Sequence, residues 1–576
     1  MTESISDLAA AASAVKETKA QKMERLKRDK NPWEAFDEVR KFAREGRDRI
    51  DPAWLSAYFR WWGIYTQGDG LGAVGGSGGE GKASEYFMMR IGVPNGVLNS
   101  HQVRKIGEIA QQYTRNMADI TTRQNIQMHW LTIESLPEVE DALHSVGLSS
   151  RSACGDVARN VTGCPLAGIA ADELVDASSL ALGIARLLSG NPEFYNLPRK
   201  FKVSIAGCPN WCSYPEINEV GLTAVQRKSG SSVETGYSIR VGGGLASQPH
   251  FGVRLNAFLH PHQVLPAVHA VTAIFRDQEV LRENRTRARM KFLFMREGWT
   301  AERFLGEMEA RLGYSLEPSA DEQMPDDVLR DHVGVHRQKQ EGLSYVGASV
   351  LRGRVSGDQL KALAELSEKF GTGDIRTTIM QNLLLINIPN AKTDDLTKEL
   401  EDIGFRVEGS NFWRGAIACT GTEFCKLAIT ETKGFTRWLV EDLETRIPEF
   451  DQQIKLNVTG CPNSCGQHWL ADIGLEGKKI KQGGKLVDAY YFCVGGAVGL
   501  HQALSRPVGY RCAATEVPEA MERLLRRYLA TRTESENLRA YFARHSNEEL
   551  RNQLAGAAVE SAARDLSPGP VPVGAG

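Results

Sequence analysis

The stretch Gly207-Cys208-Pro209-Asn210-Trp211-Cys212 recurs 253 residues later as Gly460-Cys461-Pro462-Asn463-Ser464-Cys465. Earlier in each half, an offset of 257 residues matches Gln124-Asn125 to Gln381-Asn382. A repeat of this length that occurs only twice is a whole structural unit, unlike the short units of a solenoid. We therefore expect two related halves packed around a pseudo-twofold axis.

Each half opens with the same expected order of strand, helix, strand and helix. In the first half these are strand 86–93, helix 100–114, strand 126–133 and a helix that ends near Val146. In the second half they are strand 344–351, helix 357–370, strand 383–388 and a helix that ends near Ile403. Apolar residues recur every three to four positions in the long helices, as amphipathic helices require. The alternation predicts an α+β fold built from two pseudo-symmetric repeats.

Composition excludes several classes of function. The chain has 576 residues, of which 24% are charged, and a net charge of −2. This length predicts about three or four domains, and so small a net charge gives no global field for binding nucleic acid. The first residues lack the apolar core of a secretory signal, and no stretch approaches the roughly 18 apolar residues of a membrane helix. We expect a cytoplasmic protein with reduced cysteines.

Four cysteines of the second half form two closely spaced pairs. Cys419 and Cys425 are separated by five residues, and Cys461 and Cys465 by three. Four thiolates are the ligand set of a [4Fe–4S] cluster, and the wider first loop favours that assignment. A structural zinc ion, which usually takes a tighter cysteine knuckle at both ends, and a group of buried thiols are the alternatives.

The first half keeps three of these four thiols. Cys208 and Cys212 repeat the later pair, and an offset of 255 residues places Cys164 on the first cysteine of the second-half set. Ala170 stands where the second cysteine would be, and alanine cannot bind a metal. We interpret the first half as a degenerate copy with spare thiols and no cluster.

The second-half motifs resemble those of a known family. The stretches Ala418-Cys419-Thr420-Gly421-Thr422-Glu423-Phe424-Cys425, Glu431-Thr432-Lys433 and Thr459-Gly460-Cys461-Pro462-Asn463-Ser464-Cys465-Gly466 are similar to the signature of ferredoxin-dependent nitrite and sulfite reductases. The likeness runs from about Arg60 to about Leu500. It implies a [4Fe–4S] cluster, a sirohaem whose iron is bridged to the cluster through Cys465, and ferredoxin as electron donor. We expect a monomer that binds neither nucleic acid nor membrane.

The resemblance implies a three-domain architecture, preceded by a charged helical arm that we expect to be loosely attached. The expected boundaries are 1–48 for the N-terminal helical arm, 49–150 plus 331–407 for paired ferredoxin-like half-domains, 151–330 for a first, degenerate sirohaem-side domain, 408–520 for the cluster and sirohaem-binding domain, and 521–576 for a C-terminal helix and disordered tail.

Anionic substrates and cofactors require cations. Arginine holds a fixed charge, whereas lysine can also donate a proton when its pKa is lowered. The resemblance assigns substrate binding and proton delivery to Arg90, Arg159, Lys200 and Lys202, and the sirohaem carboxylates to Arg123. Three further candidates for those carboxylates, with an exposed basic helix as the alternative, are Arg285, Arg287 and Arg289.

The second half keeps only part of this positive charge. Arg90, Arg123 and Lys200 align with Gly347, Met380 and Gln453, whereas Arg159 and Lys202 align with Arg414 and Lys455. Three of the five charges are therefore specific to the first half. This asymmetry fits one working pocket that both halves share.

Two positions bear on the choice of oxyanion. The resemblance implies lysine at position 202 in sulfite reductases and asparagine in plant-type nitrite reductases, and a further cation favours the more highly charged sulfite. Tyr65 and Cys154 stand where sulfite-reducing relatives can carry a Tyr–Cys pair, although Cys154 has a buried thiol as its alternative. We expect six-electron assimilatory reduction of sulfite to sulfide. The alternatives are reduction of nitrite to ammonia at the same site and a non-catalytic zinc-binding scaffold.

The two C-x3-C motifs should respond differently to the same substitution. We expect Cys465→Ser to disrupt the coupled iron centre, because it removes a cluster ligand and the bridge to sirohaem. Cys212→Ser should leave the iron and sirohaem content intact. Metal analysis and visible absorption of both purified variants check this, and equal cofactor loss in the two would contradict the degenerate-copy interpretation.

Overall fold

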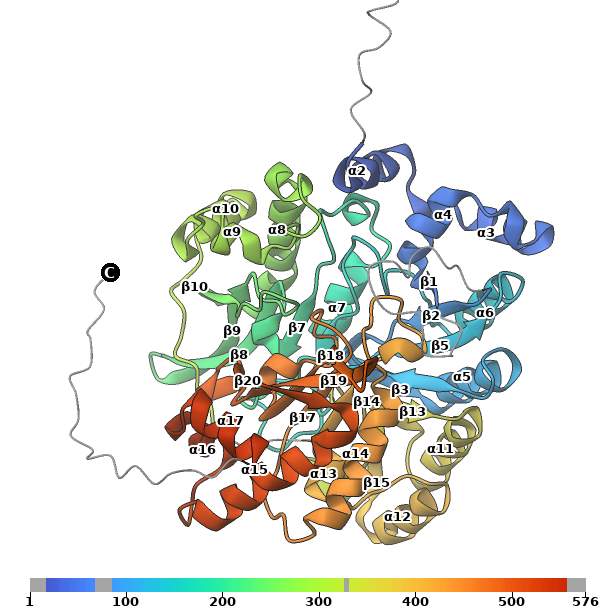
Figure 1. The fold of residues 1–576 in the computed structure, drawn as a ribbon. Helices are drawn as coiled ribbons and strands as arrows, with labels where there is room; N and C mark the ends of the chain where they lie inside the picture. Colours follow the sequence, from blue (N-terminus) through green and yellow to red (C-terminus); the bar gives the residue numbers. More distant parts are fainter. Residues whose placement is uncertain (1–16, 68–84, 326–330, 557–576) are drawn as a thin grey trace, which may run out of the picture.

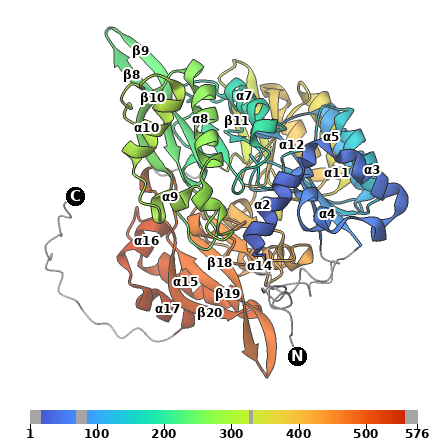
Figure 2. The same ribbon diagram turned by 90° about the horizontal axis from the view of Figure 1, so that it is seen from above.

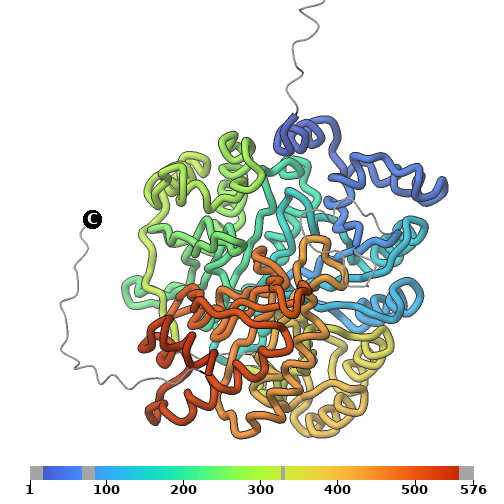
Figure 3. Tube along the Cα trace, viewed as in Figure 1, coloured from blue at the N-terminus to red at the C-terminus, as the bar shows by residue number. Residues whose placement is uncertain are grey.

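Four five-stranded sheets form the framework of the protein. A computed structural model describes residues 17–67, 85–325 and 331–556, and within these ranges each half of the chain contributes two of the sheets. Figure 1 and the tube in Figure 3 show the first half in blue to green and the second half in yellow to red. The β8–β9 and β18–β19 hairpins extend from opposite ends of the molecule, as a pseudo-twofold arrangement requires (Figure 2).

Each half begins with one antiparallel sheet, and these two sheets exchange an edge strand. The first has the order β1 (Ile64–Thr66), β2 (Phe87–Ile91), β5 (Ile126–Leu131), β4 (Ala118–Ile120) and β13 (Arg354–Val355). The second has the order β11 (Gly334–Arg337), β12 (Leu343–Ala348), β15 (Leu383–Pro389), β14 (Asp374–Thr377) and β3 (Val97–Asn99). Because β13 and β3 each complete the sheet of the other half, the two halves are joined through backbone hydrogen bonds.

The helices of these half-domains also meet across the repeat. α5 (Ser100–Tyr113) and α11 (Gly357–Phe370) begin 257 residues apart, and each has a capping box at its N-terminus. A Cβ atom on Gly107 would lie 2.8 Å from the Gly357 carbonyl oxygen, so glycine permits this close approach. α6 (Ser135–His144) and α12 (Thr393–Asp402) follow in their respective halves. The expected strand–helix–strand–helix order is confirmed in both halves.

The other two sheets carry the cysteine loops. Their strand orders are β6 (Thr162–Gly163), β7 (Val203–Ala206), β8 (Val220–Ser229), β9 (Ser232–Val241) and β10 (Val253–Leu259), and β16 (Ala416–Ala418), β17 (Leu456–Thr459), β18 (Ile473–Gln482), β19 (Lys485–Val494) and β20 (Arg506–Ala513). In both sheets the first three strands are parallel and the remaining pairs are antiparallel. The C-x3-C loops follow the equivalent strands β7 and β17.

Helices cover these two sheets in separate cores. The first core includes α7 (Ser178–Leu188), α8 (Val264–Arg276), α9 (Lys291–Met295) and α10 (Ala301–Leu312). The second includes α13 (Asn411–Gly415), α14 (Lys433–Arg446), α15 (Val517–Thr531), α16 (Leu538–Arg544) and α17 (Asn547–Ala555). The disordered tail expected after these helices lies largely outside the described residues.

Two glutamines fasten the half-domains to the cysteine-bearing sheets. Gln124, at φ +60°, donates a hydrogen bond to the Thr377 carbonyl oxygen (3.0 Å) and accepts one from the Gly163 amide (2.9 Å). Gln381, at φ +64°, makes the equivalent bonds 257 residues later, with Ile120 (2.9 Å) and Ala418 (3.1 Å). The repeated glutamine–asparagine pair is therefore a junction of three structural units.

The described part of the N-terminal arm packs against the rest of the molecule. The expectation that this arm is loosely attached was therefore wrong for these residues. It comprises α2 (Lys19–Asp29), α3 (Phe36–Glu45) and, beyond the expected boundary, α4 (Pro52–Ser56). Lys27 is fully buried and donates to the Leu197 carbonyl oxygen at 2.9 Å. Trp33 and Phe42 belong to the core of the half-domains. These buried side chains anchor the arm, which lies beside the half-domains in Figures 1 and 2.

Adding one methyl group at Gly353, beside β13, should reduce the stability of the protein. At Gly353, φ is +69° and a Cβ atom would lie 2.4 Å from the Ile120 carbonyl oxygen. Gly147 has a similar φ of +73° but open space around the Cβ position, so it is a matched control for backbone strain. We expect Gly353→Ala to reduce the free energy of unfolding by about 2 kcal/mol more than Gly147→Ala. Urea midpoints of the two variants measure this difference, and equal midpoints would contradict it.

Candidate active site

The four second-half cysteines lie at one edge of their sheet. Cys419 directly follows β16, and Cys461 and Cys465 follow its parallel neighbour β17, so both loops leave the sheet at the same edge. Burial, followed by the charge of Cys465, raises the pKa of Cys425 and that of Cys461 to about 12. The four thiols are therefore close enough to influence one another.

The loops also provide hydrogen bonds to sulfur. The Gly460 amide donates to Cys419 Sγ at 3.2 Å, and the Asn463 side-chain amide donates to Cys461 Sγ at 3.5 Å. Such donors stabilise thiolates that bind a metal cluster. Cys461 is buried whereas Cys465 is exposed. Cys465 is thus the member of the set that can reach a second group.

The spacing of these sulfurs is too wide for one metal ion. Zinc–sulfur bonds of about 2.3 Å keep ligand sulfurs within about 4.6 Å of one another. Among the described residues, three ligating atoms approach within 4.8 Å only in the first-half group Cys164, Cys208 and Cys212. The second-half set therefore lacks the close spacing of a single-ion site, and its geometry does not support the zinc alternative.

Cations of the first half face Cys465 of the second half. Arg90 lies on β2, Arg123 lies in the turn between β4 and β5, and Lys200 and Lys202 lie just before β7. The neighbouring Thr122 hydroxyl donates to the Cys465 carbonyl oxygen at 3.1 Å, which joins this turn to the cysteine loop. The charge of Cys465 also contributes to the pKa values of Arg90 and Lys200. The structure thus brings the predicted cations and Cys465 together between the halves.

The two lysines have strongly lowered pKa values. Burial, followed by the charge of Arg289, lowers the pKa of Lys200 to about 7. Burial and the charges of Arg123 and Arg289 lower the pKa of Lys202 well below its ordinary value. A lysine with a pKa near neutrality can release and regain a proton readily.

Glu219 organises the cations, although sequence reasoning did not select it. Its buried carboxylate accepts the Lys202 backbone amide at 2.9 Å and pairs with Arg289. The same offset of 253 residues places Asp472 at this position, where it accepts the Lys455 amide at 2.7 Å. The signal that could have found Glu219 is this repeated spacing between an acid and a lysine.

Two arginines retain unused donors that fit an anionic cofactor. Arg123 donates to Asn218 Oδ1 and the Asn160 carbonyl oxygen, both at 2.7 Å, and burial lowers its pKa to about 9. Its Nε atom and an Nη atom of Arg289 are buried without a hydrogen-bond partner among the described residues. Buried donors of this kind require an acceptor, and carboxylates pair well with guanidinium groups.

The other predicted site arginines, Arg159, Arg285 and Arg287, each lie in a different environment. Arg159 donates to the Gly155 carbonyl oxygen at 2.7 Å and lies close enough to Lys200 to lower its pKa. Arg285 is committed to an ion pair with the buried Asp156. Arg287 is exposed, and its assignment to the cofactor stays a prediction.

Arg90 interacts both with Tyr65 and with the residue that precedes Cys154. The Arg90 side chain donates to the carbonyl oxygen of Ala153, which precedes the buried Cys154, at 3.1 Å. Burial opposes ionisation of Tyr65, but the positive charges of Arg159 and Arg90 outweigh it and lower the pKa of this tyrosine. A Tyr65–Cys154 pair stays a prediction.

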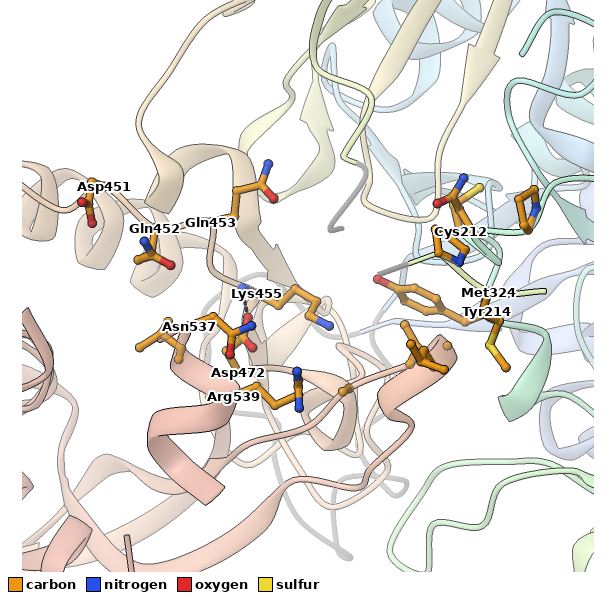
Figure 4. A pocket seen from close by; sticks show the side chains of 18 residues that line it. Cys212, Tyr214, Met324, Asp451, Gln452, Gln453, Lys455, Asp472, Asn537 and Arg539 are labelled. Atoms are coloured by element: carbon orange, nitrogen blue, oxygen red, sulfur yellow. Dashed lines mark hydrogen bonds between the residues drawn. The ribbon is translucent and has the colours of Figure 1, made fainter. Parts of the chain in front are cut away.

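A cavity of about 280 Å³ lies at the repeat-related position (Figure 4). Lys455, Gln453 and Cys212 line it, and these residues correspond to Lys202, Lys200 and Cys465. The repeat thus relates this cavity to the region around Lys202 and Cys465. Only that region combines the first-half cations with the second-half sulfurs, as an anion beside a cluster requires.

Comparison with known proteins identifies the family. Residues 154–316 and 409–561 match the nitrite and sulphite reductase 4Fe-4S domain, and residues 80–146 and 336–403 match the nitrite/sulfite reductase ferredoxin-like half domain. The chain belongs to the ferredoxin-dependent nitrite and sulfite reductases. The cofactors of this family are sirohaem and a [4Fe–4S] cluster.

The similar proteins include both sulfite reductases and nitrite reductases. A sulfite reductase [ferredoxin] of Mycobacterium tuberculosis is 36% identical over 541 residues, covering 92% of this chain and 95% of the relative. An assimilatory ferredoxin-dependent nitrite reductase of Haloferax mediterranei is 36% identical over 554 residues, covering 91% of each. The structure of Mycobacterium tuberculosis NirA matches with a TM-score of 0.87 at 35% identity, covering 92% of this chain and 97% of that one.

These comparisons confirm the α+β two-repeat architecture and the enzyme class, in which ferredoxin is the donor and a small oxyanion the substrate. Among the described helices of this reductase, none is long and apolar enough to cross a membrane. The domain boundaries stay predictions.

Activity should decline as Lys200 loses its proton. Because the pKa of Lys200 is about 7, the protonated cation is lost as the pH rises through this value, and the carboxylates of bound cofactor would move the transition upward. We expect kcat/KM for nitrite, which keeps one charge in this range, to fall about tenfold per pH unit above the transition. Lys200→Arg should delay the fall, and an unchanged profile in this variant would exclude Lys200 as the titrating group.

Proposed function

We propose that the enzyme reduces sulfite to sulfide by six electrons taken from ferredoxin. The observation that carries this proposal is the pair Lys200 and Lys202, both half-buried beside Arg90 and Arg159 on the side of the site that faces Cys465. Reduction of nitrite to ammonia is the second candidate, since a nitrite reductase relative is as similar as the sulfite reductases. We also expect a cytoplasmic monomer.

Charge favours the more negative anion. Sulfite can carry two negative charges and nitrite carries one, so each nearby cation contributes more to binding sulfite. A bound anion also raises the pKa of adjacent lysines. Each lysine is then protonated and can donate its proton to the substrate. Two lysines within one pocket, Lys200 and Lys202, therefore suit a substrate that loses three oxygens as water.

The site residues have separate roles in holding the cofactors and the substrate. Cys419, Cys425, Cys461 and Cys465 would hold the cluster, and Arg123 and Arg289 would pair with sirohaem carboxylates through their unused donors. When bound, these cofactors supply the electron path and the iron that takes the substrate. Arg90 and Arg159 provide fixed charge that orients the oxyanion, while Lys200 and Lys202 hold the protons that its oxygens require.

Lys202→Asn tests the substrate directly. We expect kcat/KM for sulfite to fall at least about tenfold, roughly 1.4 kcal/mol, because a cation and proton donor is lost. The value for nitrite should fall less than about threefold. Lys455→Asn, at the repeat-related lysine of the other cavity, is the matched control and should change neither. Steady-state rates with reduced ferredoxin measure all three proteins.

Two outcomes would contradict sulfite as the preferred substrate. One is a wild-type preference for nitrite of about tenfold or more. The other is an equal loss of both activities in Lys202→Asn with unchanged cofactor content.

A further inference from the structure

The first-half cysteines form a compact group that the reductase site does not use. Cys164 Sγ lies 3.3 Å from Cys212 Sγ and 3.8 Å from Cys208 Sγ, and all three sulfurs are within 4.8 Å of one another. A tetrahedral ion with zinc–sulfur bonds of about 2.3 Å separates its ligand sulfurs by about 3.8 Å. The group therefore has the dimensions of a single-ion site.

The surroundings exclude a larger cluster. Ala170 replaces the fourth cysteine of the second half and packs with Cys164, Leu166 and Ile169 in a small apolar core. This core also contains Tyr345 and residues of β15, so apolar side chains pack against the group of thiols. Loss of one ligand has thus left three thiols at a separation that suits one ion.

A buried arginine near the thiols bears on the charge of the ion that they can hold. Three thiolates and a divalent ion carry one net negative charge. Arg376 on β14 lies within electrostatic range of Cys164, and its Nε and one Nη atom are buried without a hydrogen-bond partner among the described residues. Its unused donors place a cation near that negative charge, although Asp374 and Asp176 also approach the same guanidinium. A monovalent ion would leave a second negative charge in this buried place.

Cys212 supplies access to solvent. It lies at the border between the thiol group and the cavity of about 280 Å³, where Figure 4 shows it near Tyr214. A fourth, open position on a three-cysteine ion can therefore take a water molecule from the cavity.

We propose that Cys164, Cys208 and Cys212 bind one zinc ion, with water as the fourth ligand. The ion would join the loop after β6 to the C-x3-C loop after β7 and so act as a structural clamp in the first half. This proposal is independent of which oxyanion the enzyme reduces.

Metal analysis of the holoenzyme tests the proposal. The protein is purified anaerobically, incubated with zinc chloride and freed of loosely bound metal by gel filtration. We expect about one zinc ion per chain in addition to the full iron and sulfide content. Zinc X-ray absorption should show about three sulfur ligands near 2.3 Å. Zinc below about 0.2 per chain, or zinc coordinated only by nitrogen and oxygen, would overturn the proposal.

Variants assign the ligands. Cys164→Ser should reduce zinc to below about 0.2 per chain while iron, sulfide and sirohaem stay at wild-type levels. Cys493→Ser changes another buried thiol, on β19, and should keep the zinc. Retention of zinc in Cys164→Ser would overturn the assignment. If that variant fails to fold, absorption spectroscopy of the wild-type zinc decides the question.

Discussion

Concentrated positive charge beside Cys465 is the constraint on which the rest of the structure depends. Arg90, Arg123 and the pair Lys200 and Lys202 come from three segments of the first half, and their mutual repulsion adds to the cost of burial. Glu219 offsets part of this charge through Arg289 and the Lys202 amide. Carboxylates of sirohaem and an anionic substrate would supply the remaining compensation. The site is thus built to be completed by anions.

Such a site requires halves that cannot move apart. Exchange of β3 and β13 joins the half-domains through sheet hydrogen bonds, and Gln124 and Gln381 fix each of them to a cysteine-bearing sheet. These contacts hold the turn containing Arg123 against the Cys465 loop. The repeat would otherwise create two equivalent sites. Divergence has left more of the cations in the first half and four closely spaced cysteines in the second, so only one of the two related sites combines both.

Much of this arrangement could be predicted from the sequence, because repeated spacing reports repeated structure. The offset of 253 residues predicted that β17 would follow the pattern of β7, whereas the choice of Cys419, Cys425, Cys461 and Cys465 as cluster ligands stays a prediction. Exchange of β3 and β13 could not be predicted, since strands of two or three residues have no periodicity. The arm was misjudged because a charged residue such as Lys27 usually lies in solvent. Its burial is compensated by ion pairs with Glu24 and Asp156 and by the Leu197 carbonyl oxygen, which lies 170 positions away in the sequence. The proximity of Cys164 to Cys212 likewise depends on packing.

The central claim is that four second-half thiolates hold an iron cluster in contact with a sirohaem between the two halves. Iron, acid-labile sulfide and sirohaem measured together in anaerobically purified wild-type protein test this claim most directly. The account predicts about five iron atoms, four sulfides and one sirohaem per chain, with strong visible absorption. A colourless protein that contains zinc in place of iron, with no labile sulfide, would contradict it.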